Sequence, residues 1–321
     1  MKEEVKFVAW FSELSNKDVS IGGGKGASLA EMYNHKFPIP PGFIITAQAY
    51  RYFLEKAKIV EIIENLLENL DVEDTKVLED TASKVRDIIV NAKMPEEMEK
   101  SIIEAYDILD IDKPNSIQTN KNALDILKNS HEPPFVAVRS SATTEDLADA
   151  SFAGQQDSFL NVKGEKDLIE KTKRCFASLF NARAVYYRTK KGFDHTKANL
   201  AVVVQKMINS EKSGVMFSKN PVADNSNIVI EAVFGLGVGI VSGMIKPDHY
   251  EVSDHEYKTL EASVSEKKVA IIRDSSGKNK TIKLTEEKSN SQVLNSFEIR
   301  ELAIFSKKLE SHYKKPQDIE F

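Results

Sequence analysis

The spacing of apolar residues changes near residue 195, and this change limits the chain to a two-part α/β architecture. Before it, apolar residues such as Val85 and Ile89 recur at helical intervals. From Leu200 onward they form short extended runs that are separated by turn residues. We therefore expect an N-terminal α/β lobe over residues 1–195 and a mostly β C-terminal lobe over residues 196–321.

The first lobe contains a charged segment, from about residue 56 to 130, that is rich in Glu, Asp and Lys. Pro95 followed by Glu96 and Glu97 predicts a helix start there. Proline loses no hydrogen bond at that position, and acidic side chains favour the positive end of the helix dipole. We interpret the segment as a helical insert with solvated charged faces.

Composition and charge exclude several classes of protein. The 321 residues are 41% hydrophobic and 29% charged, with a formal net charge of -5 and no dense run of Lys and Arg, which argues against a nucleic-acid binder. The only cysteine, Cys175, can form neither an internal disulfide nor a cysteine metal cage, and we expect it to be a buried apolar side chain. No 18 apolar residues stand together, so we expect a soluble, cytoplasmic protein with no membrane partner.

A glycine-rich segment, residues 22–26, precedes a helical pattern and contains Lys25. Backbone N–H groups in such a segment can approach an anion, the helix N-terminus adds positive charge, and the lysine supplies a point charge for a polyphosphate. It is not a Walker A loop, because Val19 stands where that motif has glycine and Gly26 where it has Ser or Thr. On these residues alone, a flexible turn with a surface lysine is an open alternative.

A buried-looking strand then presents Arg139, followed by the hydroxyl residues Ser140, Ser141 and Thr143. The end of a strand can hold a guanidinium rigidly while hydroxyls donate to phosphate oxygens. An arginine paired with a nearby acid, with serines capping the loop, is equally compatible with this stretch.

The second lobe offers Gln205 and Glu231 on extended runs, and then the loop of Gly235 and Gly237. These glycines do not form a dinucleotide fingerprint. Ile240 occupies the position of its next glycine, and the surrounding pattern indicates antiparallel strands rather than a βαβ unit.

The last candidate site is the run Asp318-Ile319-Glu320. Successive side chains of a strand point to opposite faces, so the two acids share one face. Side-by-side carboxylates near phosphates predict a Mg²⁺ site. Two solvated acids at the end of the chain remain the alternative.

The order of these motifs resembles the nucleotide-binding region of phosphoenolpyruvate synthases, and pyruvate phosphate dikinases and rifampicin phosphotransferases are similar in the same region. The resemblance runs from about Trp10 to Phe321. The segments that carry it are Gly-Gly-Lys-Gly-Ala-Ser-Leu (23–29), Pro-Pro-Gly-Phe-Ile-Ile-Thr (40–46), Val-Arg-Ser-Ser-Ala-Thr-x-Glu-Asp (138–146), Phe-Ala-Gly-Gln-Gln (152–156), Gln-Lys-Met (205–207), Ser-Gly-Val-Met-Phe-Ser-x-Asn-Pro (213–221), Glu-Ala-Val-Phe-Gly-Leu-Gly (231–237) and Asp-Ile-Glu-Phe (318–321).

The resemblance implies an ATP-grasp-like α/β (α+β) fold, in which two lobes clasp ATP, with Mg²⁺ as the metal. In that family a catalytic histidine on a separate mobile domain takes phosphate from ATP and passes it to pyruvate, which is bound in a C-terminal barrel. Water is the third substrate, and AMP and phosphate are the other products. The chain is then expected to be incomplete as an enzyme, with the phosphohistidine and pyruvate-binding domains as its partners.

By position, the resemblance implies catalytic roles for Lys25, Arg139 and Glu320, which would neutralise the polyphosphate and the charge that develops during transfer. It implies Mg²⁺ binding by Asp318 and Glu320. The residues expected to contact the nucleotide are Lys25, Arg139, Ser140, Ser141, Thr143, Gln205, Glu231, Gly235 and Gly237.

The chain departs from the family pattern in three ways. Val238 replaces a glutamate of the glycine loop, the family's next ATP-contacting strand is absent, and none of the six histidines stands in a Thr-Ser-His setting. Two alternatives therefore stay open, namely the ATP domain of a rifampicin-type phosphotransferase and a non-catalytic nucleotide-binding subunit.

Overall fold

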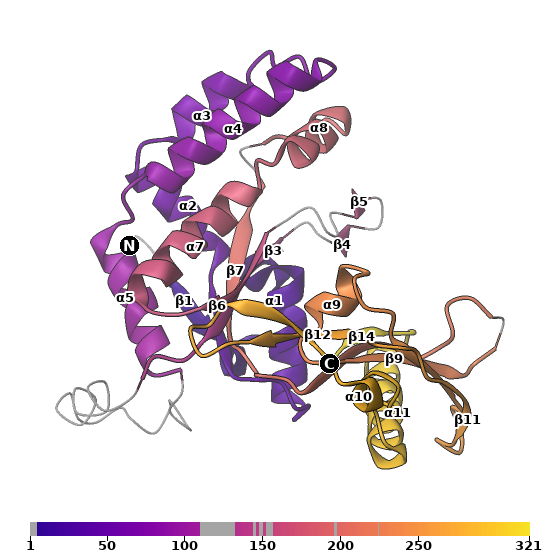
Figure 1. Ribbon diagram of the computed structural model, residues 1–321. Helices are drawn as coiled ribbons and strands as arrows, with labels where there is room; N and C mark the ends of the chain where they lie inside the picture. The colour runs from indigo at the N-terminus through magenta and orange to yellow at the C-terminus, as the bar shows by residue number, and fades with distance from the viewer. Residues whose placement is uncertain are drawn as a thin grey trace. The chain divides into compact units, whose positions relative to one another are not determined.

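The computed structural model describes residues 5–109, 132–143, 146–147, 150–151, 157–195, 198–223 and 225–321 (Figure 1). The chain divides into unit 1, Met1–Met207, and unit 2, Ile208–Phe321. This division differs from the sequence-based boundary at residue 195 by the strand β7 (Leu200–Lys206), which lies in the sheet of unit 1. The division into two nucleotide-binding lobes stays a prediction.

Unit 1 is built on an antiparallel five-stranded sheet with β7 at its centre. β7 takes this place because its apolar run 200–204 is buried on both faces, by α1 on one side and by α2 and α7 on the other (Figure 1). The strand order is β1 (Val8–Trp10), β2 (Gly42–Ile45), β7, β3 (Val136–Ala142) and β6 (Ser158–Val162). A separate small hairpin pairs β4 (Asp146–Leu147) with β5 (Ala150–Ser151).

Helices cover both faces of this sheet. α5 begins after Pro95 with three acidic residues in its first turn, which confirms the predicted helix start. The predicted insert contains α3, α4 and α5, and its remainder from residue 110 lies outside the described residues. The helical elements of unit 1 are η1 (Phe11–Glu13), α1 (Val19–Asn34), α2 (Ala47–Lys56), α3 (Val60–Leu67), α4 (Thr75–Asn91), α5 (Glu96–Asp107), α7 (Glu165–Ser178) and α8 (Ala182–Lys190).

The core of unit 1 has two parts, one on each face of the sheet. The larger part lies under α2, α4, α5 and α7, and the smaller one lies between α1 and the sheet, around Ile44 and Val203. Cys175 is fully buried in the larger part, and burial raises the pKa of its thiol. The expectation of an apolar, buried cysteine is confirmed.

Unit 2 contains a second antiparallel five-stranded sheet, so the predicted antiparallel pattern is also confirmed. One face packs against α11 (Ser296–Tyr313) around Ile230, Tyr250 and Ile299. The strand order is β11 (Thr259–Ser263), β10 (Asp248–Val252), β9 (Ile228–Phe234), β8 (Lys212–Phe217) and β14 (Asp318–Glu320). The remaining elements are the hairpin of β12 (Val269–Arg273) with β13 (Asn279–Lys283), and the short helices α9 (Val238–Val241) and α10 (Glu286–Ser289).

The ends of α11 determine how the chain enters β14. The helix begins with a capping box, in which Asn295 Oδ1 accepts from the Glu298 N–H at 2.9 Å and Glu298 Oε2 accepts from the Asn295 N–H at 2.8 Å. It ends at Lys314, whose left-handed backbone (φ 56°) turns the chain back toward the sheet.

A buried ion pair crosslinks unit 2. The side chains of Asp248 and Lys267 are both fully buried and in contact. The Asp248 carboxylate also accepts hydrogen bonds from the Ser265 N–H (2.9 Å), the Val293 N–H (2.8 Å) and the Tyr250 hydroxyl (3.0 Å). One carboxylate thus joins β10 to the segments that precede β12 and α11.

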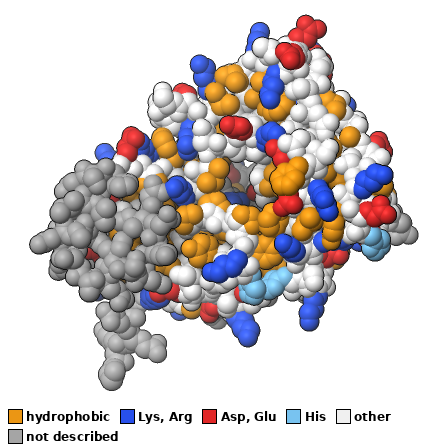
Figure 2. All heavy atoms as spheres, turned by 90° about the horizontal axis from the view of Figure 1, so that it is seen from below, with side chains coloured by type: hydrophobic (Ala, Val, Ile, Leu, Met, Phe, Trp, Pro, Cys, Tyr) orange, Lys and Arg blue, Asp and Glu red, His pale blue; other side chains and the backbone are white. Residues whose placement is uncertain are grey.

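The surface carries charges of both signs. On the face in Figure 2, Lys and Arg side chains are interspersed with Asp and Glu. Among the described residues, none of the helices combines the length and the apolarity needed to cross a lipid bilayer.

Candidate functional site

The glycine-rich segment forms a kink within α1. The Asp18 carbonyl accepts from the N–H groups of Ile21 and Gly22, both at 2.9 Å, so a helical turn already exists before the kink. At Gly23 the backbone takes φ 68° and ψ 173°, and the helix resumes after it. A helix follows the kink, as the glycine-rich segment predicts, and the turn that begins at Val19 shows that helical structure also precedes it.

A buried serine holds this kink against β3. The Ser141 hydroxyl donates to the Gly22 carbonyl at 2.8 Å and accepts from the Gly26 N–H at 3.0 Å, and the residue is fully buried. A Cβ atom at Gly23 would lie 2.2 Å from the Ser141 carbonyl oxygen, so only glycine fits at this approach. Ser141 therefore positions the glycine segment, and its hydroxyl is already engaged by protein groups.

Arg139 and Gln205 lie on the same sheet face as Ser141. Residues paired across antiparallel strands share a face, and the register pairs Arg139 with Val203 and Ala137 with Gln205. α1 packs over this face through Ala30. The element that carries Lys25 thus covers the face that bears the arginine.

Lys25 and Arg139 are both half-buried. Cys175 Sγ lies 3.7 Å from the Val138 carbonyl oxygen, and the Lys25 charge opposes the burial effect by lowering the pKa of this thiol. The Lys25 ammonium is therefore within electrostatic range of the β3 segment next to Arg139. Gln205 is largely buried, and its amide donates to the Pro40 carbonyl at 3.2 Å.

The other two hydroxyl residues have different surroundings. Ser140 lies on the opposite face from Arg139, and its hydroxyl (3.0 Å) and N–H (3.2 Å) both donate to the Asp157 carbonyl. The structure thus does not bring its side chain together with Arg139. Thr143 follows the end of β3 and donates to the Asn199 carbonyl through its hydroxyl at 3.2 Å. The segment 152–156 lies outside the described residues.

In unit 2, the acidic pair shares one face of the sheet. Asp318 pairs with Phe217 and Glu320 with Val215, while Ile319 pairs with Met216 on the core side. Burial, and next the charge of Glu320, raise the pKa of Asp318. The two carboxylates thus lie on one face, where the charge of Glu320 opposes ionisation of Asp318, and together they form a donor set suited to a divalent cation.

The same face bears Glu231 and His249. The register aligns Glu320, Val215, Glu231 and His249 across four strands, and His249 Nδ1 lies 3.5 Å from Glu231 Oε1. His249 belongs to none of the sequence motifs described above. Its signal was the alternation in β10, where the buried residues Asp248, Tyr250 and Val252 leave His249 on the outer face.

The loop of Gly235 and Gly237 packs against β12. Gly235 has φ 81°, and a Cβ atom there would lie 2.2 Å from the Ile271 carbonyl oxygen, which accepts from the Leu236 N–H at 2.7 Å. Gly237 precedes α9, and Val238 packs against an apolar cluster that includes Leu236 and Ile271. The local role of Gly235 is thus close backbone packing.

Comparisons with known proteins bear on this arrangement. The family model described as pyruvate phosphate dikinase, AMP/ATP-binding domain, matches residues 19–321. A probable phosphoenolpyruvate synthase of Methanocaldococcus jannaschii is 44% identical over 320 residues, covering 99% of this chain and 26% of that protein. One of Archaeoglobus fulgidus is 45% identical over 314 residues (98% and 39%), and the phosphoenolpyruvate synthase of Pyrococcus furiosus is 41% identical over 355 residues (98% and 42%).

The chain spans less than half the length of each of these relatives. The resemblance seen in the ordered motifs is confirmed by the match over 19–321 and by these identities. On this basis the chain belongs to the family of the pyruvate phosphate dikinase AMP/ATP-binding domain.

Proposed function

We propose that this chain binds Mg-ATP as the nucleotide-binding module of a phosphoenolpyruvate synthase-like phosphotransferase. The observation that carries the proposal is the Ser141 hydroxyl, which joins the kink of α1 to β3. The elements that bear Lys25 and Arg139 therefore form one packed structure. Two cations on such a structure suit a triphosphate, because phosphoryl transfer depends mainly on positioning and charge neutralisation.

Within this proposal, Lys25 and Arg139 contact the phosphates and Ser141 keeps their elements in register. Thr143 lines the phosphates at the end of β3, and Gln205 contacts the adenine end. Ser140 contributes by shaping β3, since both of its donors are bonded to Asp157. Glu231 and the loop of residues 235–237 contribute nucleotide contacts from unit 2, and the two units act as the lobes of an ATP-grasp clasp.

We also propose that Asp318 and Glu320 hold the Mg²⁺ ion that accompanies ATP. The raised pKa of Asp318 supports this, since a cation between the carboxylates would relieve their repulsion. The bound ion would neutralise charge on the phosphates during transfer. Glu320 is the proposed catalytic member, and the register keeps its side chain on the same face as Asp318.

The full reaction needs further domains. One phosphoryl group of ATP would pass to a histidine on a separate domain and from there to pyruvate, and water would accept the other, so that AMP and phosphate are the other products. The names of the relatives support this acceptor, and their greater length leaves room for such domains. Mixing the chain with a candidate histidine domain, or fusing the two, should produce AMP only when both proteins are present. If neither the mixture nor the fusion protein releases AMP from ATP, the assignment is contradicted.

Titration calorimetry with Mg-ATP tests the nucleotide site directly. Lys25→Ala and Arg139→Ala should each weaken binding by about 10-fold or more, because each removes a charge-assisted hydrogen bond worth roughly 1.5–3 kcal/mol. Lys93→Ala and Arg174→Ala are matched controls, since each removes a cation from an exposed ion pair with a glutamate, at 3.0 Å and 2.9 Å respectively. A wild-type chain that does not bind ATP, or binding by Lys25→Ala and Arg139→Ala equal to that of the controls, would refute the proposal.

A further inference from the structure

The strand that carries the acidic pair is short and lies at an edge. β14 has three residues and pairs with β8 at the end of the sheet order. It carries the two carboxylates on one face, two residues apart. A short edge strand under like-charge repulsion needs anchors at both ends to keep its carboxylates in place.

The far end of β14 is anchored through Gly214. The Gly214 N–H donates to the Phe321 carbonyl and the Phe321 N–H donates to the Gly214 carbonyl, both at 3.0 Å. A Cβ atom at Gly214 would lie 2.5 Å from the Phe321 ring, so the close approach depends on glycine. This end is held by backbone geometry.

The near end is anchored through Ser218, which follows β8. Its N–H donates to the Gln317 carbonyl at 2.9 Å, and its hydroxyl oxygen accepts from the Gln317 N–H at 2.8 Å. Ser218 is fully buried. A side-chain oxygen therefore fixes the residue directly before Asp318.

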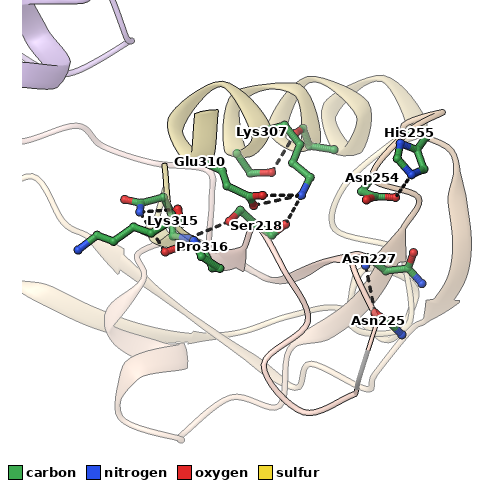
Figure 3. Close-up of polar contacts among 12 residues, drawn as sticks. Ser218, Asn225, Asn227, Asp254, His255, Lys307, Glu310, Lys315 and Pro316 are labelled. Atoms are coloured by element: carbon green, nitrogen blue, oxygen red, sulfur yellow. Dashed lines mark hydrogen bonds and ion pairs between the residues drawn. The ribbon is translucent and has the colours of Figure 1, made fainter. Parts of the chain in front are cut away.

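Lys307 of α11 supports this anchor. Its ammonium donates to the Ser218 carbonyl at 2.9 Å and to both carboxylate oxygens of Glu310, at 3.1 and 3.0 Å (Figure 3). The Lys307 side chain is only 18% exposed. The contact chain thus runs from Glu310 through Lys307 and Ser218 to Gln317.

We propose that Ser218 and Lys307 are positioning residues for the acidic pair. The Ser218 hydroxyl fixes Gln317, and Lys307 fixes the Ser218 backbone, so that Asp318 meets the cation together with Glu320. This inference rests on the proposed role of the acidic pair in holding the divalent cation. It adds residues that touch neither the nucleotide nor the ion.

The test uses the full 321-residue chain with Mn²⁺ as a spectroscopic probe in the presence of ATP. Ser218→Ala should weaken Mn²⁺ binding by about 10-fold, as expected for loss of an outer-shell partner. Lys307→Met should weaken it about 3-fold, because it acts through one more hydrogen bond. Binding of metal-free ATP should be unchanged in both, and the Gln317 amide should exchange its hydrogen faster in Ser218→Ala.

The matched control is Ser306→Ala. Ser306 is also a fully buried serine of unit 2, and its hydroxyl donates to the Ala303 carbonyl at 2.9 Å within α11. Losing a buried hydroxyl there should lower stability without changing Mn²⁺ affinity. If Ser218→Ala does not fold, Lys307→Met makes the same comparison with Ser218 intact.

Two further variants separate this inference from the proposed function. If Asp318→Asn weakens Mn²⁺ binding but Ser218→Ala and Lys307→Met behave like Ser306→Ala, the positioning role is refuted and the metal site stands. If neither Asp318→Asn nor Glu320→Gln changes Mn²⁺ affinity, the metal site itself is refuted, and the positioning role with it.

Discussion

Replacing Gly23 by alanine should disrupt the structure that joins α1 to β3. The backbone at Gly23 (φ 68°, ψ 173°) lies in a region that is essentially restricted to glycine, where another residue costs about 1–3 kcal/mol. The added Cβ would also lie 2.2 Å from the Ser141 carbonyl oxygen and 2.3 Å from its Oγ. The serine must then move, which breaks its two hydrogen bonds to the glycine segment, each worth about 1 kcal/mol.

The expected loss in the free energy of unfolding for Gly23→Ala is therefore about 4 kcal/mol, a large part of the 5–15 kcal/mol typical of a folded domain. Gly164→Ala is the matched control. Gly164 has a similar backbone (φ 88°, ψ 154°), but no atom lies within 4 Å of a Cβ placed there. The free energy of unfolding of Gly164→Ala should therefore fall by only about 2 kcal/mol, from backbone strain alone.

Urea unfolding of both variants, with ATP titration of the folded proteins, measures the difference. Gly23→Ala should lose about 2 kcal/mol more stability than Gly164→Ala, and it should also bind ATP about 10-fold more weakly, whereas Gly164→Ala should bind as the wild type does. Equal losses of stability in the two variants would show that the contact with Ser141 contributes nothing, and would refute the claim that this serine holds the kink of α1 against β3.

Three further predictions concern buried titratable groups. Lys267→Met should lower the free energy of unfolding in urea by about 3–5 kcal/mol, because it leaves the buried Asp248 carboxylate without its cation. A decrease below about 1 kcal/mol would contradict this. Burial and next the charge of Arg188 lower the pKa of His195 to about 4, below the ordinary value near 6.5. The unfolded chain therefore binds a proton that the folded chain does not, so stability should fall as the pH drops from about 6.5 to 4. The loss should be well under about 3 kcal/mol, because the imidazole is partly exposed and solvent screens it, and the slope should be weaker in His195→Asn. Since burial raises the pKa of Cys175, iodoacetamide at pH 8 should alkylate it more than about 10-fold more slowly in the folded than in the urea-unfolded chain, and equal rates would exclude its burial.

Local patterns predicted much of this fold. The extended run at 200–204 and the shared face of Asp318 and Glu320 follow from side-chain periodicity, and the helix start after Pro95 follows from proline and the acidic residues behind it. The same two-residue period, applied to β3, also places Ser140 opposite Arg139 and Ser141.

Other features depend on contacts between distant residues and leave no local signal. The Ser141 hydroxyl bonds to groups 115 and 119 residues away, so the glycine run predicts a break in the backbone but not the strand residue that holds it. β7 was assigned to the C-terminal lobe because its composition resembles that of the later strands. Its place beside β2 and β3 depends on pairing that composition does not encode. The anchor of Gln317 on Ser218 is non-local in the same way.

The kink of α1 and its buried serine also constrain how such a module can be redesigned. A chimaera that takes residues 19–34 from a relative but keeps β3 unchanged places another helix over the Ser141 hydroxyl, whose position matches the glycines of this chain. Because each segment supplies hydrogen-bond partners to the other, we expect chimaeras to keep the stability of the parent chain only when the two are exchanged together. The helix and the strand are thus the smallest part of unit 1 that can be exchanged as a whole.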